Sequence, residues 1–448
     1  MPSIKKILIA NRGEIALRII RACRDMGIRS VAVYSTADKD SLHVKLADES
    51  VCIGPAPARE SYLNESAILT AALLTNADAI HPGYGFLSER ADFVDKVVIH
   101  KLIWIGPDAD TIRRMGDKVA AKKTAEQCGL PVVPGSSGSV DSVESALEWA
   151  EKTGYPVILK ASAGGGGKGM RRVYAAAEMA DAFQMTRAEA ANGFGDDTLY
   201  MEKLLETPQH IEFQVLGDTH GNVVIFGERD CTLQRKHQKV MEECPAASIE
   251  PGTRKEMIDI CQKAAKQMGY VNAGTMEFMF QDGLFYFLEM NTRLQVEHPV
   301  TEMVYNVDLV HEQIRIAMGE KLGYTQKDLK PVGHAMEFRI NAEDPETFVP
   351  NAGTITAYSP PGGLGVRVDS AAYDGWRIPP TYDSMIAKLI VWAPTRAACI
   401  LRSARALDEF SIEGVKTTIP LHKKLLANKD VKSLKIDNHW LERFLEKK

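Results

Sequence analysis

The sequence predicts a multidomain chain, with an α/β fold at its amino end and an α+β fold at its carboxyl end. Its 448 residues exceed what one small core can organise, and at ~100–200 residues per domain they suggest two to four domains. The amino end alternates apolar strand runs with a helical run, whereas the carboxyl end groups its strand runs before a helix. A chain of this length can bury a large active-site cleft.

The amino-terminal region predicts the start of an α/β domain that continues to about residue 115. Strand runs are expected at residues 7–10, 30–34, 79–80 and 102–105. A helix is expected at 15–26, ended by Gly27. The order is Rossmann-like, but the first turn, Asn11-Arg12-Gly13, lacks the GxGxxG series that admits a pyrophosphate. A dinucleotide site is therefore not expected there.

The carboxyl-terminal region, from Gly333, predicts a separate α+β domain. Strand runs at 334–340 and 365–368 come before a helical run at 397–410.

A glycine-rich segment lies between strand runs at 157–160 and 171–174. Five glycines occupy six positions within Gly164-Gly-Gly-Gly-Lys-Gly169, so backbone N–H groups there could wrap phosphate oxygens, with Lys160 and Lys168 adding charge. The segment is not a P-loop, because Gly169 follows Lys168 where a P-loop has Ser or Thr. A phosphate cover and a flexible surface hairpin both remain open from these residues alone.

Residues 275–291 predict an apolar hairpin around the turn Gln281-Asp282-Gly283. With a three-residue turn, Glu277, Glu289 and Asn291 share one face of the hairpin; with a two-residue Asp-Gly turn they do not. Two carboxylates and an amide on an apolar face need a compensating cation, and oxygen ligands suit Mg²⁺ or Mn²⁺. The alternative is a solvated face, but the flanking Met and Phe residues favour a metal.

The segment that follows, Arg293-Leu-Gln295-Val-Glu297-His-Pro, carries groups suited to a small oxyacid. Arg293 offers a planar fork, Gln295 a neutral donor, and Glu297 a carboxylate that could accept a proton.

Other polar residues are ambiguous in isolation. The basic stretch from Arg235 to Lys239 is more often a solvated loop than a site, unless it meets the metal. His210 could be structural, and Tyr84, in a glycine-flanked turn, could stack on a ligand or cap a loop.

Composition argues against several classes of partner. Lys and Arg number 54 against 59 Asp and Glu, for a net charge of -5, so no global field favours nucleic acid or membrane. The seven cysteines are widely spaced without a CxxC pair, which favours a reducing cytoplasm. Neither a signal peptide nor an apolar run of ~18 residues is present.

Seven segments together resemble the biotin carboxylase family in its own order, nearly from end to end. They are KILIANRGEIALRI, HPGYGFLSE, KASAGGGGKGM, ERDCTLQRKHQK, EMNTRLQVEHPVTE, GHAMEFRINAEDP and PPTYDSMIAKL. The resemblance implies an amino-terminal α/β domain at 1–115, a central ATP-grasp domain at 116–330 with a glycine-rich lid at about 131–203, and a carboxyl-terminal α+β domain at 331–448.

The resemblance also implies roles for individual residues. The ATP phosphates are assigned to Lys118, Lys160, Gly166 and Gly167. Adenine is assigned to Glu202, Lys203 and Leu205, and further nucleotide contacts to His210, Gln234 and His237. The Mg²⁺ (or Mn²⁺) ligands are Glu277, Glu289 and Asn291. Bicarbonate is assigned to Lys239, Arg293, Gln295 and Val296, with Glu297 as the base that lets it attack the γ-phosphate to give carboxyphosphate. Arg339 stabilises the biotin enolate, with Tyr84 and Asp383 around the biotin ring.

The same resemblance implies partners. No Met-Lys-Met occurs before the chain ends at Lys448, so we expect biotin on a separate biotin carboxyl carrier protein, a separate carboxyltransferase, and a homodimer. Two other functions stay open: another ATP-grasp ligase that makes an acyl phosphate, and a non-catalytic nucleotide-binding subunit. The acyl acceptor, which could be acetyl-CoA for fatty acid synthesis, propionyl-CoA or pyruvate, is not decided by this chain.

Overall fold

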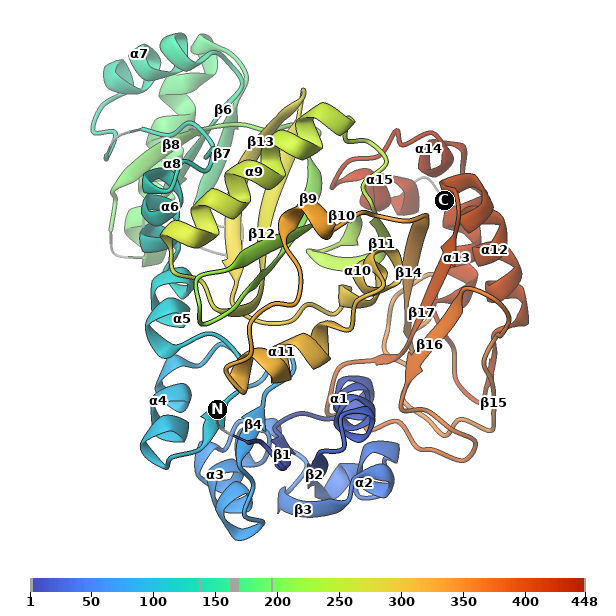
Figure 1. Cartoon of the computed structure of the whole chain (residues 1–448). Helices are drawn as coiled ribbons and strands as arrows, with labels where there is room; N and C mark the ends of the chain where they lie inside the picture. The colour runs from blue at the N-terminus through green and yellow to red at the C-terminus, as the bar shows by residue number, and fades with distance from the viewer. Residues whose placement is uncertain (1–2, 137, 162–168, 195, 447–448) are drawn as a thin grey trace. The chain divides into compact units, whose positions relative to one another are not determined.

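The computed structural model describes residues 3–136, 138–161, 169–194 and 196–446 (Figure 1). The chain forms two compact units. The first unit comprises Met1–Leu130, Gln209–Met279 and Leu288–Lys448, and the second comprises Pro131–Pro208 and Phe280–Phe287.

The amino-terminal part of the first unit is built on a parallel sheet with the strand order β3-β2-β1-β4-β5. Its strands are β1 (Lys6–Ile9), β2 (Arg29–Ser35), β3 (Glu49–Gly54), β4 (Ala79–His81) and β5 (Ile103–Trp104). The helices in this part are α1 (Gly13–Asp25), α2 (Leu42–Leu46), α3 (Glu65–Leu74), α4 (Ala91–Ile99), α5 (Ala109–Gly116) and α6 (Lys118–Gln127). The predicted Rossmann-like order is confirmed. The predicted apolar runs lie on the central strands β2, β1 and β4 and on the edge strand β5.

Two turns at the carboxyl ends of β1 and β4 are tied together by Asn11. Its Nδ2 donates to the carbonyls of Pro82 and Tyr84, both at 2.7 Å. Between them Gly83 has φ +62°, and a Cβ there would lie 3.0 Å from Ile15. The turn that carries Tyr84 is thus fixed against the start of α1.

A second sheet has the strand order β13-β12-β9-β10-β11-β14-β17-β16, and each pairing from β9 to β16 is antiparallel. Its strands are β9 (Gln209–Gly217), β10 (Val223–Arg235), β11 (Gln238–Cys244), β12 (Asn272–Gln281), β13 (Leu284–Asn291), β14 (His334–Asn341), β16 (Val366–Ser370) and β17 (Met385–Ala393). The helices associated with it are α9 (Pro251–Gln267), α10 (His298–Tyr305), α11 (Leu309–Ala317) and α12 (Arg396–Glu409).

β14 shows how this sheet separates apolar from charged side chains. Met336, Phe338 and Ile340 alternate along one face and join the apolar core that includes residues of α12. Glu337 and Arg339 project to the other face, which α10 covers. The two helices lie on opposite sides of β14 and β17 in Figure 1.

The register of this sheet brings charged residues from distant segments side by side. Glu242 of β11 lies opposite Glu337 of β14, and Arg339 of β14 lies opposite Lys388 of β17. Directly opposed residues on antiparallel strands have Cβ atoms ~4.5–5.5 Å apart, so these side chains interact.

The turn between β12 and β13 is the shorter of the two alternatives that the sequence left open. The strands end at Gln281 and resume at Leu284, and both Asp282 (φ +53°) and Gly283 (φ +80°) are left-handed. This is the combination that a two-residue type I′ hairpin requires. The two-residue alternative, in which Glu277, Glu289 and Asn291 were not expected to share one face, is therefore the one that the structure shows.

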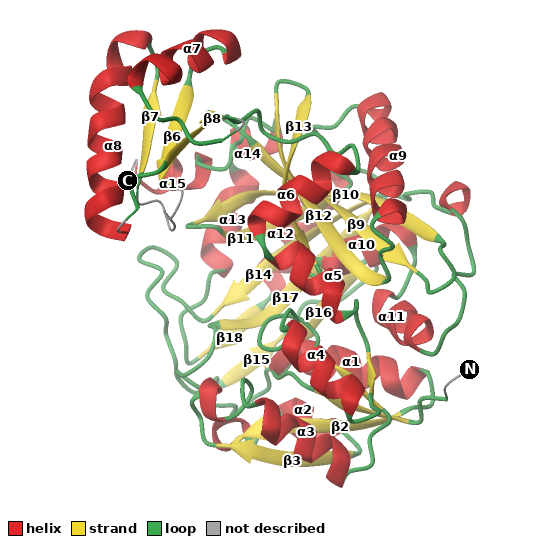
Figure 2. Cartoon of the chain, turned by 90° about the vertical axis from the view of Figure 1, so that its left-hand side faces the viewer, coloured by secondary structure: helices red, strands yellow, loops and turns green. Residues whose placement is uncertain are grey.

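The second unit is built on a sheet with the order β7-β6-β8, formed by β6 (Val157–Ala161), β7 (Met170–Val173) and β8 (Leu199–Lys203). Helices α7 (Val143–Thr153) and α8 (Met179–Phe194) belong to this unit, and α8 lies along β6 and β7 (Figure 2). The predicted strands on either side of the glycine-rich segment are confirmed as an antiparallel pair. Residues 162–168 of that segment lie outside the described residues.

Short elements complete the chain. They are β15 (Ala357–Ser359), β18 (Ser411–Glu413), α13 (Ile419–Ala427), α14 (Lys429–Lys432), α15 (Trp440–Glu446) and the 3₁₀ turns Thr36–Asp38, Ala58–Glu60, Ala176–Glu178 and Gln326–Asp328. Within the described part of the chain, no helix combines the length and the apolar composition that crossing a membrane demands.

Candidate active site

Lys239, on β11, lies at the centre of a buried group of charged side chains. Its ammonium donates to Glu212 Oε2 at 2.6 Å, Glu277 Oε1 at 3.0 Å and Glu297 Oε1 at 2.6 Å. Burial acts to lower the pKa of Lys239, but its acidic neighbours raise that pKa well above the usual value. The lysine therefore stays charged and joins three carboxylates from separate segments.

Glu297 is fully buried, and a cation holds each of its oxygens. Oε1 accepts from Lys239 and Oε2 accepts from Arg339 Nη2 at 2.9 Å. Burial alone would raise the pKa of Glu297, but Lys239, Arg339 and Arg229 lower it well below the usual value. In this arrangement Glu297 is an ionised carboxylate without a proton to give.

Arg339 joins Glu297 to a second pair of acidic residues. Its Nε donates to Glu242 Oε1 at 2.6 Å. Burial raises the pKa of Glu242 to about 7, although Arg339 acts in the opposite sense. Opposite Glu242, Glu337 is fully buried, neither of its oxygens has a hydrogen-bond partner among the described residues, and burial raises its pKa well above the usual value. Two opposed buried carboxyls do not both ionise easily, so this pair retains a proton at neutral pH.

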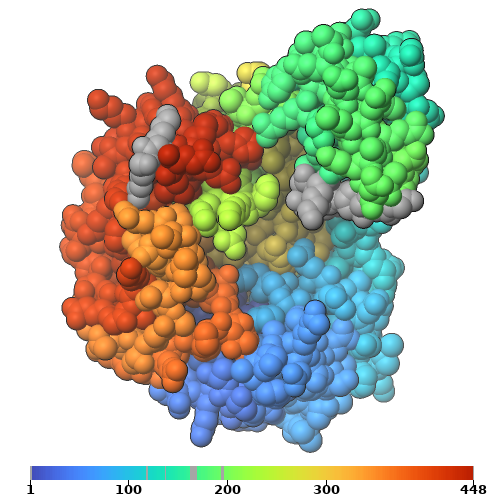
Figure 3. All heavy atoms as spheres, turned by 180° about the vertical axis from the view of Figure 1, so that it is seen from behind, coloured from blue at the N-terminus to red at the C-terminus, as the bar shows by residue number. Residues whose placement is uncertain are grey.

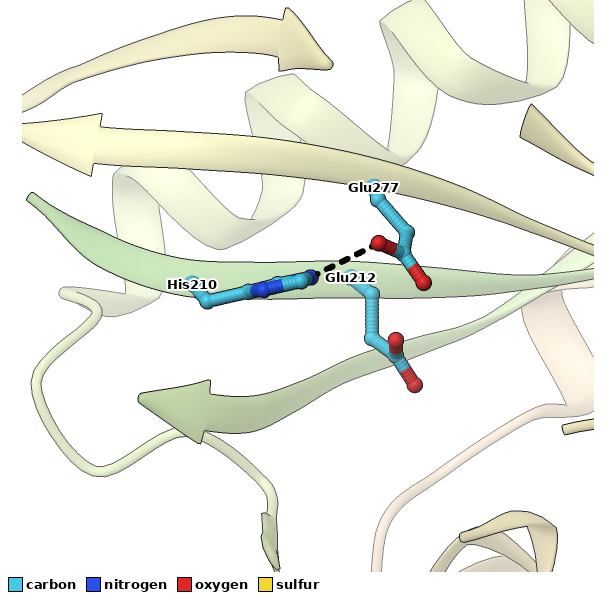
Figure 4. A group of neighbouring side chains, drawn as sticks. All are labelled: His210, Glu212 and Glu277. Atoms are coloured by element: carbon cyan, nitrogen blue, oxygen red, sulfur yellow. Dashed lines mark ion pairs between the residues drawn. The ribbon is translucent and has the colours of Figure 1, made fainter. Parts of the chain in front are cut away.

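Glu277, on β12, is the other acidic centre of the cluster. Its Oε1 accepts from Asn291 Nδ2 at 2.8 Å and Gln295 Nε2 at 3.0 Å, besides Lys239. Its Oε2 lies 3.0 Å from His210 Nε2. Figure 4 shows the His210 ring pointing at the Glu277 carboxylate, with Glu212 beside them. The contact with Asn291 brings two of the three predicted metal ligands together despite the two-residue turn.

The predicted ligands fit Mg²⁺ by their chemistry. Glu289 precedes Asn291 by two residues on β13, so in a regular strand both project to the same face. All three predicted ligands offer oxygen, which Mg²⁺ prefers, and Glu277 presents Oε2 toward His210. A second set of possible ligand atoms, on His210, Glu212 and Glu277, lies within 4.8 Å of one another.

The second set is already neutralised by the protein itself. Arg229 is fully buried and donates through Nε to Glu212 Oε1, while Lys239 occupies Glu212 Oε2. The rest of the Arg229 guanidinium is held by neutral oxygens of Gln214 at 2.8 Å, Thr301 at 2.9 Å and Thr275 at 3.1 Å. Arg229 therefore fixes Glu212, which in turn positions Lys239.

Arg293 presents its guanidinium at the edge of this cluster. Nη2 donates to Asn291 Oδ1 and Nη1 to Gln295 Oε1, both at 2.9 Å. Nε donates to Glu89 Oε2 at 2.9 Å. The planar fork predicted from the sequence is thus oriented by two amides and one partly exposed carboxylate.

Tyr84 lies in a neighbouring group around Lys388. Its hydroxyl hydrogen bonds to Glu14, whose Oε1 is 3.4 Å from Lys388 Nζ. Lys388 Nζ also donates to the carbonyl of Val296 at 2.7 Å and lies 5.9 Å from the centre of the Tyr84 ring. Because Lys388 lies opposite Arg339 in the sheet, this group adjoins the Lys239 cluster.

Three further predicted residues lie on the β10–β11 hairpin or in the loop before β17. Gln234 is buried opposite Lys239 in the β10–β11 pairing, while His237 is exposed in the turn between those strands. Asp383 is exposed, and its Oδ1 accepts from the Met385 N–H at 2.9 Å.

The remaining predicted nucleotide contacts lie in the second unit or outside the described residues. In the second unit, Lys160 pairs with Glu202, Lys203 donates to the carbonyls of Gly154 and Tyr155 at 2.9 Å each, and Leu205 is half-buried. Outside the described part lie Gly166, Gly167 and the side chain of Lys118.

The structure adds residues that the sequence reasoning missed, namely Glu212, Arg229, Glu242, Glu337, Lys388 and Glu14. A signal was present for Glu212, because His210, Glu212 and Gln214 alternate along the otherwise apolar strand β9. The same sequence signal was present for Glu337 and Arg339, which are charged residues at alternate positions of β14. Of the basic stretch, Lys239 meets Glu277 from β11, whereas Lys236 and His237 are exposed in the turn between β10 and β11.

Family models match three consecutive parts of the chain. Residues 3–112 match "Biotin carboxylase, N-terminal domain", residues 117–325 match "Carbamoyl-phosphate synthase L chain, ATP binding domain", and residues 337–443 match "Biotin carboxylase C-terminal domain". The biotin carboxylase of Haemophilus influenzae is 54% identical over 443 residues, covering 99% of each chain. The chloroplastic biotin carboxylase of Arabidopsis thaliana is 53% identical over 438 residues, covering 97% of this chain and 82% of that protein.

Solved structures agree with these sequence matches. A biotin carboxylase–βγ-ATP complex from Campylobacter jejuni is 49% identical with a TM-score of 0.89, covering 98% of this chain and 99% of that one. The biotin carboxylase domain of a thermophilic 2-oxoglutarate carboxylase bound to bicarbonate is 46% identical with a TM-score of 0.94, covering 99% and 98%. These matches define an ATP-dependent ligase with an ATP-binding domain between two biotin carboxylase domains. The chain belongs to the biotin carboxylase family.

Proposed function

We propose that this chain uses ATP to activate bicarbonate and then carboxylates biotin, with Glu297 as the base. The observation that carries the proposal is the buried Glu297 carboxylate held between Lys239 and Arg339, next to the group of Glu277, Gln295 and Arg293. A small planar anion entering such a group meets a lysine, two arginines and a potential proton acceptor. These are the parts needed to make bicarbonate a nucleophile.

Glu297 becomes a base only when its cations are drawn away. At rest both its oxygens are bonded and its pKa is low. A bound bicarbonate competes for Lys239, and as that contact weakens the pKa of Glu297 rises. The same cations favour the ionised form of the substrate. Substrate binding thus couples the loss of the bicarbonate proton to its capture by Glu297.

The bicarbonate contacts are assigned to Lys239, Arg293, Gln295 and Val296. Arg293 matches a planar anion with its fork, and its present partners are two neutral amides and one partly exposed carboxylate, Glu89, which an anion can displace. Positioned in this way, bicarbonate attacks the γ-phosphate of ATP, the bond from the γ-phosphorus to the bridging oxygen breaks, and carboxyphosphate and ADP form.

Biotin is assigned to Arg339, Tyr84 and Asp383. Arg339 would stabilise the enolate that forms when biotin loses its N–H proton, because a buried guanidinium is worth more to an anion than an exposed one. The adjacency of Arg339 to Lys388, and of Lys388 to Tyr84, supports this assignment.

The nucleotide contacts stay as the sequence predicted them, on the residues from Lys118 to His237 named above. Glu277, Glu289 and Asn291 would hold Mg²⁺, in agreement with their oxygen donors. When bound, the ion supplies positive charge that neutralises phosphate oxygens.

Partners, compartment and domain limits are also proposals. We keep a separate biotin carboxyl carrier protein, a carboxyltransferase and a homodimer, and the domain limits 1–115, 116–330 with a lid at about 131–203, and 331–448. A cytoplasmic, reducing location is supported by the seven cysteines, all of them free. Capture of the carrier and its carboxyltransferase with this chain as bait would identify the acyl acceptor.

The test of the proposed function is phosphate release measured with and without bicarbonate and free biotin. We expect ATP cleavage to require bicarbonate and to rise with biotin, and Glu297→Gln to lower it at least ~100-fold. Glu243→Gln is a matched control, because Glu243 is also a buried carboxylate, held by His334 and Arg396 on the opposite face of the sheet.

Each contrary outcome identifies a different function. ATP cleavage that needs an acceptor other than bicarbonate would indicate another acyl-phosphate ligase. Nucleotide binding without turnover would indicate a regulatory subunit. An equal loss of phosphate release in Glu297→Gln and Glu243→Gln would contradict the role of Glu297 as base.

A further inference from the structure

Arg12, in the turn after β1, forms an ion pair with Asp38 and a cation–π contact with Tyr382. Its guanidinium donates to both carboxylate oxygens of Asp38, through Nε at 2.6 Å and Nη2 at 2.7 Å. Its Cζ lies 4.2 Å from the centre of the Tyr382 ring. Burial acts to lower the pKa of Arg12, but Asp38 raises it above the usual value, so the cation persists. Arg12 therefore fixes a ring that is more than 360 residues away in sequence (382 against 12).

The Tyr382 ring is anchored at its other end by the amino-terminal sheet. Its hydroxyl hydrogen bonds to Ser35 Oγ and to the carbonyl of Ala56, both at 2.5 Å. Ser35 ends β2, and Ala56 follows β3, so both contacts lie beyond the carboxyl ends of parallel strands. Figure 3 shows the amino-terminal part (blue) directly against the orange carboxyl-terminal part on the face drawn there.

A second aromatic contact extends this cluster to the turn that carries Tyr84. Tyr62 is fully buried, donates to Asp38 Oδ2 at 2.6 Å and meets Tyr382 edge-on at 5.5 Å between ring centres. Its other neighbour is Phe86, stacked at 5.1 Å with an interplanar angle of 26°. Phe86 has φ +45°, an unfavourable conformation for a bulky residue that persists only where the surroundings impose it.

The cluster thus joins the two loops that hold two of the three proposed biotin contacts, Tyr84 and Asp383. Phe86 lies two residues after Tyr84, and Tyr382 lies immediately before Asp383. Resting on the proposed function, we propose that Arg12, Asp38, Tyr62, Phe86 and Tyr382 are positioning residues that set Tyr84 and Asp383 at their working separation before biotin binds. We call these five residues the loop clamp.

The loop clamp is suited to position without taking part in catalysis. Its two charged residues neutralise each other, because the Arg12 guanidinium is paired with the Asp38 carboxylate. The nearby His43 is fully buried, and burial lowers its pKa to about 4, so it adds no charge at neutral pH. Within the described part of the chain, the hydrogen bonds of Lys239, Arg293 and Glu297 involve none of the five residues. Glu89, three residues after Phe86, does accept from Arg293, but in the proposed function bicarbonate displaces it. Loss of the clamp should therefore affect biotin and spare bicarbonate activation.

The experiment compares Arg12→Met with Lys45→Met, using free biotin as the probe. Lys45 is a matched control, because its Nζ also lies 4.2 Å from the centre of a tyrosine ring, that of Tyr373 in the carboxyl-terminal region, and donates to its hydroxyl at 2.6 Å. We expect Arg12→Met to raise the KM for biotin about tenfold, the effect of losing one charge-assisted contact that orders a loop. Biotin-independent, bicarbonate-dependent ATP cleavage should stay within about twofold of the wild type, and Lys45→Met should change neither quantity.

Two further variants keep the test decisive if Arg12→Met folds poorly in thermal melts. Tyr382→Phe keeps the ring over Arg12 and loses the two hydroxyl contacts. Tyr382→Leu loses the ring contact and the two hydroxyl contacts. We expect the KM for biotin to be higher in Tyr382→Phe than in the wild type, and higher again in Tyr382→Leu. In a double-variant cycle the Arg12→Met and Tyr382→Leu effects should be less than additive.

The outcomes separate this inference from the proposed function. If the wild type forms carboxybiotin and the Arg12 and Tyr382 variants keep its KM for biotin, the loop clamp is merely structural and the inference is wrong. Equal losses of ATP cleavage and biotin turnover would also overturn it. If the wild type forms no carboxybiotin, the proposed function fails, and this inference fails with it.

Discussion

Arg339→Met removes the guanidinium that links Glu242 to Glu297 and that we place on the biotin enolate. Because bicarbonate is assigned to Arg293 and Lys239, the variant should still cleave ATP in a bicarbonate-dependent way. Carboxybiotin formation should fall about 100-fold, or ~3 kcal/mol, the usual effect of removing one preorganised charge from a buried transition state. Phosphate release and carboxybiotin are measured on the same enzyme samples.

The structure also sets the expected effect on stability. Breaking a buried ion pair costs roughly 3–5 kcal/mol when the remaining charge is left alone. Here the effect should be smaller, ~2 kcal/mol, because Glu297 keeps Lys239 and because Glu242, with a pKa of about 7, can take up a proton.

The pKa of Glu242 sets how the stability deficit of the Arg339→Met variant changes with pH. This pKa is already raised in the folded state, and removing Arg339 raises it further, so the folded variant holds a proton that the unfolded chain loses. The stability deficit should therefore be small near pH 5 and should grow toward pH 8. Thermal melts at both pH values measure it.

Arg396→Met is the control for this variant. Arg396 makes a similar buried pair with Glu243, at 2.7 Å and 2.8 Å, on the opposite face of the sheet. It should lower stability without changing the ratio of carboxybiotin to released phosphate. An Arg339→Met enzyme that kept both activities coupled at normal levels would refute the biotin role of Arg339.

Three further variants test the rest of the site. Arg293→Met should lower phosphate release and carboxybiotin together by about 100-fold, since both need bound bicarbonate; a loss confined to carboxybiotin would contradict this. Glu289→Gln should sharply reduce ATP turnover with the fold intact, and near-normal turnover at low Mg²⁺ would rule out its metal role. Glu337→Gln should flatten the pH dependence of stability: the raised pKa of Glu337 gives the wild type stability that is lost as pH rises through that pKa, and Gln cannot ionise. Melts from pH 5 to pH 9 with parallel wild-type and variant curves would show that Glu337 is already ionised.

The fold of the amino-terminal region was predictable because its signals are local. Apolar runs bounded by turn residues mark the buried strands, and the predicted ends lie within two residues of β1, β2, β4 and β5. The hairpin turn at Asp282-Gly283 was less predictable. The sequence Gln281-Asp282-Gly283 is compatible with a two-residue and a three-residue turn. Which turn forms depends on how the paired strands twist.

The predicted site residues that share one stretch of chain lie together in the structure. Asn291, Arg293, Gln295 and Glu297 follow one another at intervals of two, and the structure joins each of them to the same cluster. Their roles in binding and catalysis remain predictions. The residues that were missed lie on other strands, where an isolated Glu or Arg is as common on a solvated face as in a site.

The sequence by itself determined the positions of four of the five strands in the amino-terminal sheet, the family resemblance and the local groups of chemically capable residues. Only the tertiary structure decided which of these groups meet. Glu242, Glu297 and Arg339 are far apart in the chain, and they converge because of sheet register and the placement of α10, neither of which local periodicity encodes. Burial is decided at the same level, and burial makes Glu242 hold its proton near neutral pH while two cations keep Glu297 ionised.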